Sequence, residues 1–288
     1  MLSVSVIIPA FNPGRYIEAA IKSVLDQTYA PIEIIVVDDE SAEDLSRLDT
    51  IDPDVRRVRQ ANTGQAGARN RGMKEACGDL IAFLDQDDLW WPTKLARQIT
   101  LLESNPNMPA CHAQFDFIDG EGRCLGSGFG RAQDRLDLLE GNGVCGASSL
   151  LVRRSSVHRV GDFDTKWEPA EDYDWLLRLS SIGQIGFVET LELSYRKHDS
   201  NQSLNYARMY KAICRILKHH GAIDKTSNHR ARTGIKNYKR VAASQALDQA
   251  RLALHDRRPL DVVSHLWWMT TREPTSVFTA ASRWLKAR

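Results

Sequence analysis

Several features that would assign this chain to a common class are missing from its sequence. Its 288 residues include 5 cysteines, widely spaced and without a C-x-x-C pair, so neither a disulfide framework nor a zinc site is predicted. No stretch approaches the roughly 20 apolar residues of a membrane-spanning helix. The first residues, "SVSVIIPAFN", lack the basic segment and the apolar run that mark a signal peptide. We therefore expect a soluble protein of a reducing, cytoplasmic compartment.

The net charge of the chain is close to zero, which hides an uneven distribution. Residues 206–288 contain 17 Lys or Arg and 5 Asp or Glu, a net charge of +12, and residues 1–205 carry −11. Because the sequence contains no zinc finger, RNP motif or other recognisable reader, the basic tail by itself does not indicate a nucleic-acid partner. We predict two parts, an acidic domain of residues 1–205 and a basic helical extension of residues 206–288.

Short apolar runs alternate with helical patterns in the first hundred residues. Residues 4–8 form a continuous apolar run, typical of a strand that is covered on both faces. Similar runs occur at residues 32–37 and 80–84, and a further strand is expected near residues 55–58. Helical spacing lies between them, and a further helix is expected to begin at Pro92. This alternation predicts an α/β fold with a mostly parallel sheet flanked by helices.

Acidic residues follow two of these predicted strands. They are Asp38, Asp39, Asp85, Asp87 and Asp88. Ligands of open α/β sheets bind outside the carboxyl ends of the strands, where these side chains are expected to meet. Each aspartate taken singly has an alternative role in capping a helix or solvating a turn. Five carboxylates that lie together repel one another, so a cation or hydrogen-bond donors are needed to offset their charge. Mg²⁺ and Mn²⁺ prefer carboxylate ligands. The pattern favours a metal that holds a diphosphate.

Four segments carry a resemblance to a known family. The quoted stretches are "VSVIIPAFNPGRYIEAAIKSVLDQTY", "EIIVVDDES", "NTGQAGARNRGMKEACGDLIAFLDQDDLW" and "EDYDWLLRL". In order and spacing they resemble the family 2 glycosyltransferases, which have a Rossmann-like GT-A fold, and the likeness runs from about residue 4 to residue 203. It implies a transferase that moves a sugar from a nucleoside diphosphate, UDP being favoured, to a carbohydrate or lipid-linked acceptor in polysaccharide or glycolipid biosynthesis.

The resemblance also implies donor-binding residues. The loop formed by Pro9, Ala10 and Phe11 is expected to line the base and the ribose, and Asp39 to accept a hydrogen bond from the base. Arg69 is expected near the base and the diphosphate, although a surface helix arginine is the alternative. These residues would form a binding site for the nucleotide of the donor.

Metal ligands are implied in the same way. "Asp85-Gln86-Asp87" matches the family's D-x-D motif, in which Asp85 faces the ribose and Asp87 the metal. Asp88 is expected either to assist the metal or to cap the following turn. His198 loosely matches a histidine that completes the metal shell in some members. The implied cofactor is Mn²⁺ or Mg²⁺.

The catalytic base is expected in "EPAEDYDW". Inverting transfer needs a base that takes the proton of the acceptor hydroxyl as its oxygen attacks the anomeric carbon. The resemblance to the family's "ED" motif assigns this role to Asp172, with Glu171 as second choice. Capping of the following helix is the alternative for both acids. Asp174 is expected to bond locally.

The tail and the overall function leave alternatives. Trp267, Trp268 and Trp284 lie among basic residues, so the tail either contacts an anionic membrane at the cytoplasmic face or packs as a helical lid. The alternative to an enzyme is a nucleotide-sugar-binding module that lacks transferase activity, because a fold does not fix a function.

Overall fold

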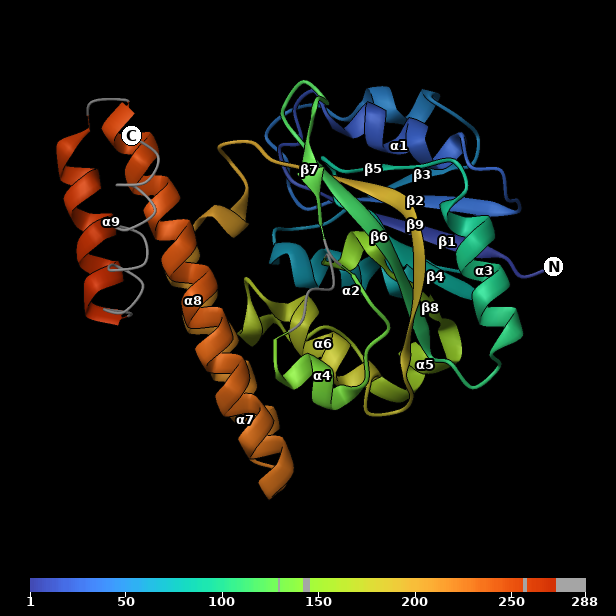
Figure 1. Ribbon diagram of the computed structural model, residues 1–288. Helices are drawn as coiled ribbons and strands as arrows, with labels where there is room; N and C mark the ends of the chain where they lie inside the picture. The colour runs from blue at the N-terminus through green and yellow to red at the C-terminus, as the bar shows by residue number, and fades with distance from the viewer. Residues whose placement is uncertain (129, 142–145, 256–257, 273–288) are drawn as a thin grey trace. The chain divides into compact units, whose positions relative to one another are not determined.

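The computed structural model describes residues 1–128, 130–141, 146–255 and 258–272 (Figure 1). The chain divides into two compact units. The first comprises Met1–Leu138 and Asn142–His198, and the second comprises Leu139–Gly141 and Asp199–Arg288. The division into residues 1–205 and 206–288 stays a prediction about folding domains, and the two units are described separately below.

A nine-stranded sheet forms the centre of the first unit. Its order is β3-β2-β1-β4-β8-β6-β9-β5, with β7 paired to β6. The strands are β1 (Val4–Ala10), β2 (Ile32–Asp38), β3 (Val55–Arg59), β4 (Leu80–Phe83), β5 (Leu89–Trp90), β6 (Ala110–Ile118), β7 (Cys124–Ser127), β8 (Leu151–Arg153) and β9 (Ile185–Arg196).

The four strands that the sequence predicted pair in parallel, whereas the remaining strands add both parallel and antiparallel pairs. Strands β3, β2, β1 and β4 pair in parallel, as the alternation of strands and helices predicted. Next to β4, however, β8 runs antiparallel, and β6 and β9 form a further parallel pair. The α/β class is therefore confirmed. Although β8 and β6 lie between β4 and β9, the loop after β4 reaches the end of β9, where Asp88 accepts the backbone N–H of Arg196.

Helices cover both faces of this sheet. They are α1 (Ile17–Leu25), α2 (Gly64–Glu75), α3 (Lys94–Ser104), α4 (Arg135–Leu139), α5 (Arg154–Val160) and α6 (Glu171–Leu179). Every residue of β1 is buried, and its even-numbered residues pack into one core with α1 and α3. On the other face Ile7 meets α2 so closely that a Cβ at Gly72 would lie 2.3 Å from Ile7 Cγ2. Helix α3 begins at Lys94, two residues after Pro92.

Small residues allow α2 to lie against the sheet. Its buried positions include Ala66, Ala68 and Gly72, which have little or no side chain to hold the helix away. The glycine-containing loop before it was predicted to run into a helix, and the structure confirms this. Close packing of α2 matters because the helix carries Arg69 into the interior.

The second unit consists mainly of three helices. They are α7 (Tyr206–Gly221), α8 (Lys225–His255) and α9 (Pro259–Arg272). Its core contains alanines of α8 together with Tyr206 and Met269, and Trp268 packs edge-on against Tyr206 and Tyr210. Among the described residues, no helix is both long enough and apolar enough to span a membrane.

Candidate active site

A buried arginine joins two of the predicted acidic segments. Arg69, in α2, is only 2% exposed. Its NH2 group lies 2.7 Å from Asp85 Oδ1, after β4, and its NH1 group lies 2.6 Å from Glu171 Oε1, in α6. Burial alone would lower the pKa of this guanidinium, but the neighbouring carboxylates, Asp85 first, raise it. The surface-arginine alternative is therefore wrong.

Aromatic packing sets the position of this cluster. Trp175, in α6, stacks on Phe163 with a centroid distance of 4.4 Å and meets Phe83, the last residue of β4, edge-on. The Trp175 ring Nε1 donates a hydrogen bond to the carbonyl of Gly161. The Arg69 guanidinium lies over the Phe163 ring. These contacts hold α6, β4 and α2 together next to the carboxylates of Asp85 and Glu171 and the guanidinium of Arg69.

Asp172 lies in the first turn of α6 beside this cluster. Its Oδ1 accepts the backbone N–H of Tyr173, so the carboxylate does bond locally, as the capping alternative expected. Its Oδ2 accepts no hydrogen bond from the described residues and would lie 3.5 Å from a Cβ at Gly146. Burial and the Glu171 carboxylate raise the pKa of Asp172 to about 7, against the opposing effect of Arg69. One oxygen of a carboxylate with a near-neutral pKa therefore remains available for proton transfer.

The other two acids of α6 are already engaged. Glu171 is 2% exposed and bonds Arg69 through Oε1, while its Oε2 is buried without a hydrogen-bond partner among the described residues. Asp174 accepts a hydrogen bond from Arg178, one turn along the same helix, as predicted. The geometry therefore favours Asp172 over Glu171 as a base.

Asp39 lies at the N-terminus of α2. Its two oxygens accept the backbone N–H groups of Thr63 and Gly64, at 3.0 and 2.9 Å, and Oδ1 also accepts from the Gln60 amide. Oδ2 has a single hydrogen bond from the described residues, so it retains capacity for a further donor. The amides of a helix N-terminus favour a charged carboxylate. Asp39, which is 3% exposed, thus fixes the start of α2.

The loop after β1 is fixed by the middle residue of the D-x-D motif. The Gln86 side chain accepts from Phe11 N–H at 2.8 Å and donates to the Phe11 carbonyl at 3.3 Å. Pro9 and Ala10 are buried at the end of β1, whereas the Phe11 side chain is 49% exposed. The two hydrogen bonds fix the Phe11 backbone, and its exposed ring offers a surface for stacking. Of the predicted loop residues, Phe11 is the one whose side chain a ligand can reach.

Asp87 and His198 form a pair. His198 Nε2 lies 2.7 Å from Asp87 Oδ2, and the imidazole stacks on Tyr16. Burial and the Asp85 carboxylate raise the pKa of Asp87, and His198 partly offsets this. The two residues are 111 positions apart in sequence, so the structure brings together the D-x-D motif and the histidine that the resemblance suggested.

The predicted four-residue metal set does not form as a whole. Among the described residues, no group of three His, Cys, Asp or Glu side chains is arranged to hold a metal ion. Asp88 is 1% exposed, and its Oδ1 accepts the backbone N–H of Arg196 at 3.0 Å. Asp85 Oδ1 faces Arg69 and Gln65. In the described residues one oxygen of Asp88 thus bonds the end of β9 and one oxygen of Asp85 bonds a buried arginine, and the four-residue metal set stays a prediction.

Sequence reasoning missed several supporting residues. Arg196, at the end of β9, donates from Nε to the Asp87 carbonyl, and Ser148 Oγ accepts the Asp85 N–H. Glu168 accepts the N–H of Ala66 at the start of α2. Glu168 belongs to the "EPAEDYDW" stretch, so attention to that acid was possible from sequence. Arg196 gave no such signal because its partners are distant in the chain, and for Ser148 the sequence suggested only a place near the acceptor.

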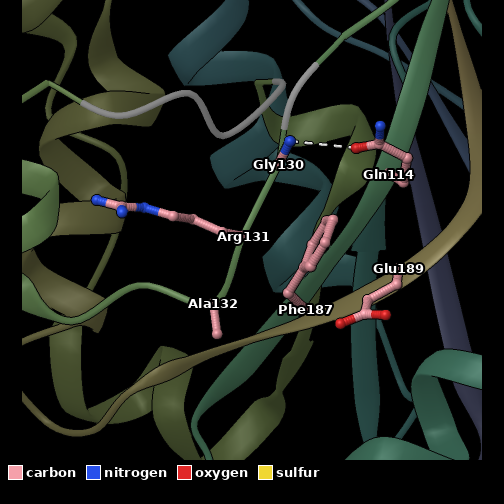
Figure 2. Close-up of a pocket in the computed structure, with 6 residues that line it drawn as sticks. All are labelled: Gln114, Gly130, Arg131, Ala132, Phe187 and Glu189. Carbon is pink, nitrogen blue, oxygen red and sulfur yellow. Dashed lines mark hydrogen bonds between the residues drawn. The ribbon is translucent and has the colours of Figure 1, made fainter.

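A cavity of about 400 Å³ lies elsewhere in the first unit, between β6, β9 and residues 130–132 (Figure 2). Gln114 accepts Gly130 N–H through Oε1 and donates to the Gly128 carbonyl, so both ends of its amide are used. In Figure 2 the Arg131 side chain extends away from Phe187 and Glu189. None of the predicted site residues lines this cavity. It belongs to the packing of residues 130–132 on β6 and β9.

Comparison with known proteins identifies the family of this α/β chain. The model described as Glycosyl transferase family 2 matches residues 5–161. The chain belongs to this family and is a glycosyltransferase. The matched range includes Asp39, Arg69 and the D-x-D motif and ends before Asp172 and His198.

Two curated relatives extend the match. An uncharacterised glycosyltransferase of Nostoc sp. is 33% identical over 220 residues, covering 72% of this chain and 68% of that protein. The Escherichia coli protein WfgD is 38% identical over 223 residues, covering 74% of this chain and 85% of its own length. Its name describes a UDP-Glc:α-D-GlcNAc-diphosphoundecaprenol β-1,3-glucosyltransferase.

Solved structures support the fold. Residues 1–349 of S. aureus TarS, crystallised with UDP-GlcNAc, match with a TM-score of 0.61 and 14% identity, covering 90% of this chain and 89% of that one. A second TarS structure contains UDP. At such low identity the likeness concerns the fold alone. The GT-A fold predicted for this chain is confirmed.

Proposed function

We propose that this protein is a metal-dependent inverting glycosyltransferase that moves a sugar from a UDP-sugar to a hydroxyl of a lipid-linked acceptor. The observation that carries the proposal is the cluster around Arg69. One guanidinium is shared by Asp85 and Glu171, and Asp172 lies beside them with a pKa of about 7. Because the Arg69 guanidinium is shared among three carboxylates, this cluster carries excess negative charge. One of the carboxylates, Asp172, then has a pKa close to neutral pH.

For the donor, Phe11, Asp39 and Arg69 are the proposed recognition residues. The exposed Phe11 ring offers a stacking surface for a base, and Asp39 Oδ2 has capacity for an N–H donor such as the imide of uracil. The UDP complexes of TarS and the UDP-Glc named for WfgD support a uridine nucleotide. Arg69 contributes positive charge near the diphosphate.

Asp87 and His198 are the proposed metal ligands. A carboxylate and an imidazole suit Mn²⁺ or Mg²⁺, which take further ligands from substrate phosphates and water. The raised pKa of Asp87 fits this role, because local negative charge and burial disfavour its ionised form in the absence of a cation. When bound, the metal would neutralise charge on the departing diphosphate.

Asp172 is the proposed general base. Its Oδ2 takes the proton of the acceptor hydroxyl while that oxygen forms a bond to the anomeric carbon. The bond from this carbon to the diphosphate oxygen breaks, and its electron pair leaves with the nucleotide, so the configuration inverts. A pKa near the working pH suits a base in this step. Glu171 and Arg69 act as positioning residues for Asp172 and Asp85.

The acceptor class follows from the relative rather than from the site. The name of WfgD describes transfer to a sugar on diphosphoundecaprenol, and by analogy we propose a lipid-linked saccharide as acceptor here. Such an acceptor lies in a bilayer, so the proposed place of reaction is the inner face of the cytoplasmic membrane, within polysaccharide or glycolipid synthesis.

The test is a transfer assay with a panel of UDP-sugars, Mn²⁺ and a water-soluble, short-chain glycosyl-diphosphate-lipid. Release of UDP that depends on acceptor, with the opposite anomeric configuration in the product by NMR, supports the proposal. Product of retained configuration, or full turnover in EDTA, contradicts the inverting or the metal-dependent part. A donor preference for a purine nucleotide contradicts the assignment of Asp39.

A further inference from the structure

Helix α9 has two different faces. On the inner face, His265 Nδ1 lies 2.7 Å from Tyr206 Oη, Trp268 packs on Tyr206 and Tyr210, and Met269 is buried. On the outer face, Leu260, Val263 and Trp267 follow one another at i, i+3 and i+7, so they share one side of the helix. They are 83%, 64% and 65% exposed. We call these three residues the α9 strip.

The structure separates the two tryptophans that the sequence placed together. Trp268 is partly buried and packs against the core of the second unit, whereas Trp267 is 65% exposed. Trp284 lies outside the described residues. Trp268 therefore packs within its own helical unit rather than as the lid that the sequence offered as an alternative. The membrane hypothesis then concerns only the face of α9 that carries Trp267.

Exposed basic and apolar residues precede and follow the strip in the chain. Leu252 and Leu254, at the end of α8, are exposed in the chain segment that leads to α9. Arg251, Arg258 and Arg272 are exposed as well. The acids Asp248 and Asp261 pair with Arg251 and Arg258 at 3.3 Å, so they neutralise part of this charge. Over the whole of residues 206–288, however, basic residues outnumber acidic ones by 17 to 5.

We propose that the α9 strip docks the protein on the surface of an anionic lipid bilayer. Leucine, valine and tryptophan on one side of a helix, with arginines at its ends, are the composition of a helix that lies in a membrane interface. The excess of positive charge selects anionic lipid, and a peripheral mode of binding needs no spanning helix. The inference deepens the proposed function, on which it rests for the lipid-linked acceptor, but its test requires no transfer.

The experiment is flotation of the purified full chain with vesicles of phosphatidylcholine containing 30% phosphatidylglycerol, compared with pure phosphatidylcholine. We expect binding to the anionic vesicles at low salt and its loss in high salt. In the triple variant Leu260→Ser, Val263→Ser, Trp267→Ser, the partition coefficient is expected to fall by about 10-fold or more. The matched control is Val241→Ser, which changes an exposed valine of α8 outside the strip.

Each outcome decides the proposal. Unchanged binding by the triple variant, equal binding to neutral vesicles, or no binding by the wild-type chain overturns it. A fall in oligomeric state in the triple variant, measured by light scattering, identifies the strip as a contact between copies of the chain and also overturns it. Transfer to the water-soluble acceptor should persist in the triple variant. Failure of that transfer in the wild type contradicts the proposed function and leaves the vesicle result to be judged separately.

Discussion

The substitution Asp172→Asn should separate stability from activity. In the folded protein the pKa of Asp172 is about 7, compared with an ordinary value of 3.8. Because the folded state holds the proton more tightly than the unfolded chain, the carboxylate destabilises the fold increasingly as the pH rises from about 4 to 7. Above pH 7 the cost is complete and amounts to about 4 kcal/mol.

Asparagine carries no titrating proton, so the variant avoids this cost. Relative to wild type, Asp172→Asn should gain about 3 kcal/mol more at pH 8 than at pH 5, because the wild-type penalty is only partly developed at pH 5. For a unit of this size the gain corresponds to roughly 6–12 °C in Tm. The measurement is thermal unfolding of the protein in EDTA, without donor, at both pH values.

Transfer should change in the opposite direction. Loss of a general base costs about 10²–10⁴-fold in turnover. The wild-type turnover should fall about tenfold per pH unit below pH 7, as Asp172 takes up its proton, and the residual activity of Asp172→Asn should lack this acid limb. Asp174→Asn is the control, because it removes a carboxylate from the same helical turn that bonds Arg178. An active Asp172→Asn enzyme, or a variant with no pH-dependent gain in Tm, would refute the reasoning.

Three further substitutions test the supporting residues. Arg69→Met leaves buried carboxylates without their cation and should destabilise the fold by about 3–5 kcal/mol in chemical denaturation, whereas Arg71→Met on the exposed side of the same helix should cost less than about 1 kcal/mol. Gln86→Ala frees the Phe11 backbone and should raise the KM for the donor several-fold with little change in Tm; an unchanged KM would contradict the proposed stacking role. His198→Ala should weaken Mn²⁺ binding in the presence of UDP by at least 10-fold, measured by calorimetry, and equal affinity would remove it from the metal site.

The sequence by itself determined the parallel half of the sheet and the chemical types at its edge. Continuous apolar runs predict strands covered on both faces, and β1 is buried along its whole length. The several motifs of the sequence pointed to the family and to the acidic residues that follow β2 and β4. These signals are local, because a strand, its following turn and the first residues of a helix are contiguous in the chain.

The tertiary structure decided which of those acids act together. Asp85, Asp87 and Asp88 are neighbours in sequence, yet they face Arg69, His198 and the backbone of Arg196. Their partners come from 16 to 111 positions away, and successive residues of a turn point in different directions. Only packing could assign each acid its partner.

The same reason explains the two tryptophans of α9. Adjacent residues of a helix are turned by about 100° from each other, so one ring enters the core while the next faces outward. Composition marked both residues as interfacial, and the packing of the partly buried Trp268 against Tyr206 and Tyr210 left that role to Trp267. The sequence shows which residue types are present, whereas the direction in which each side chain points follows only from the tertiary structure.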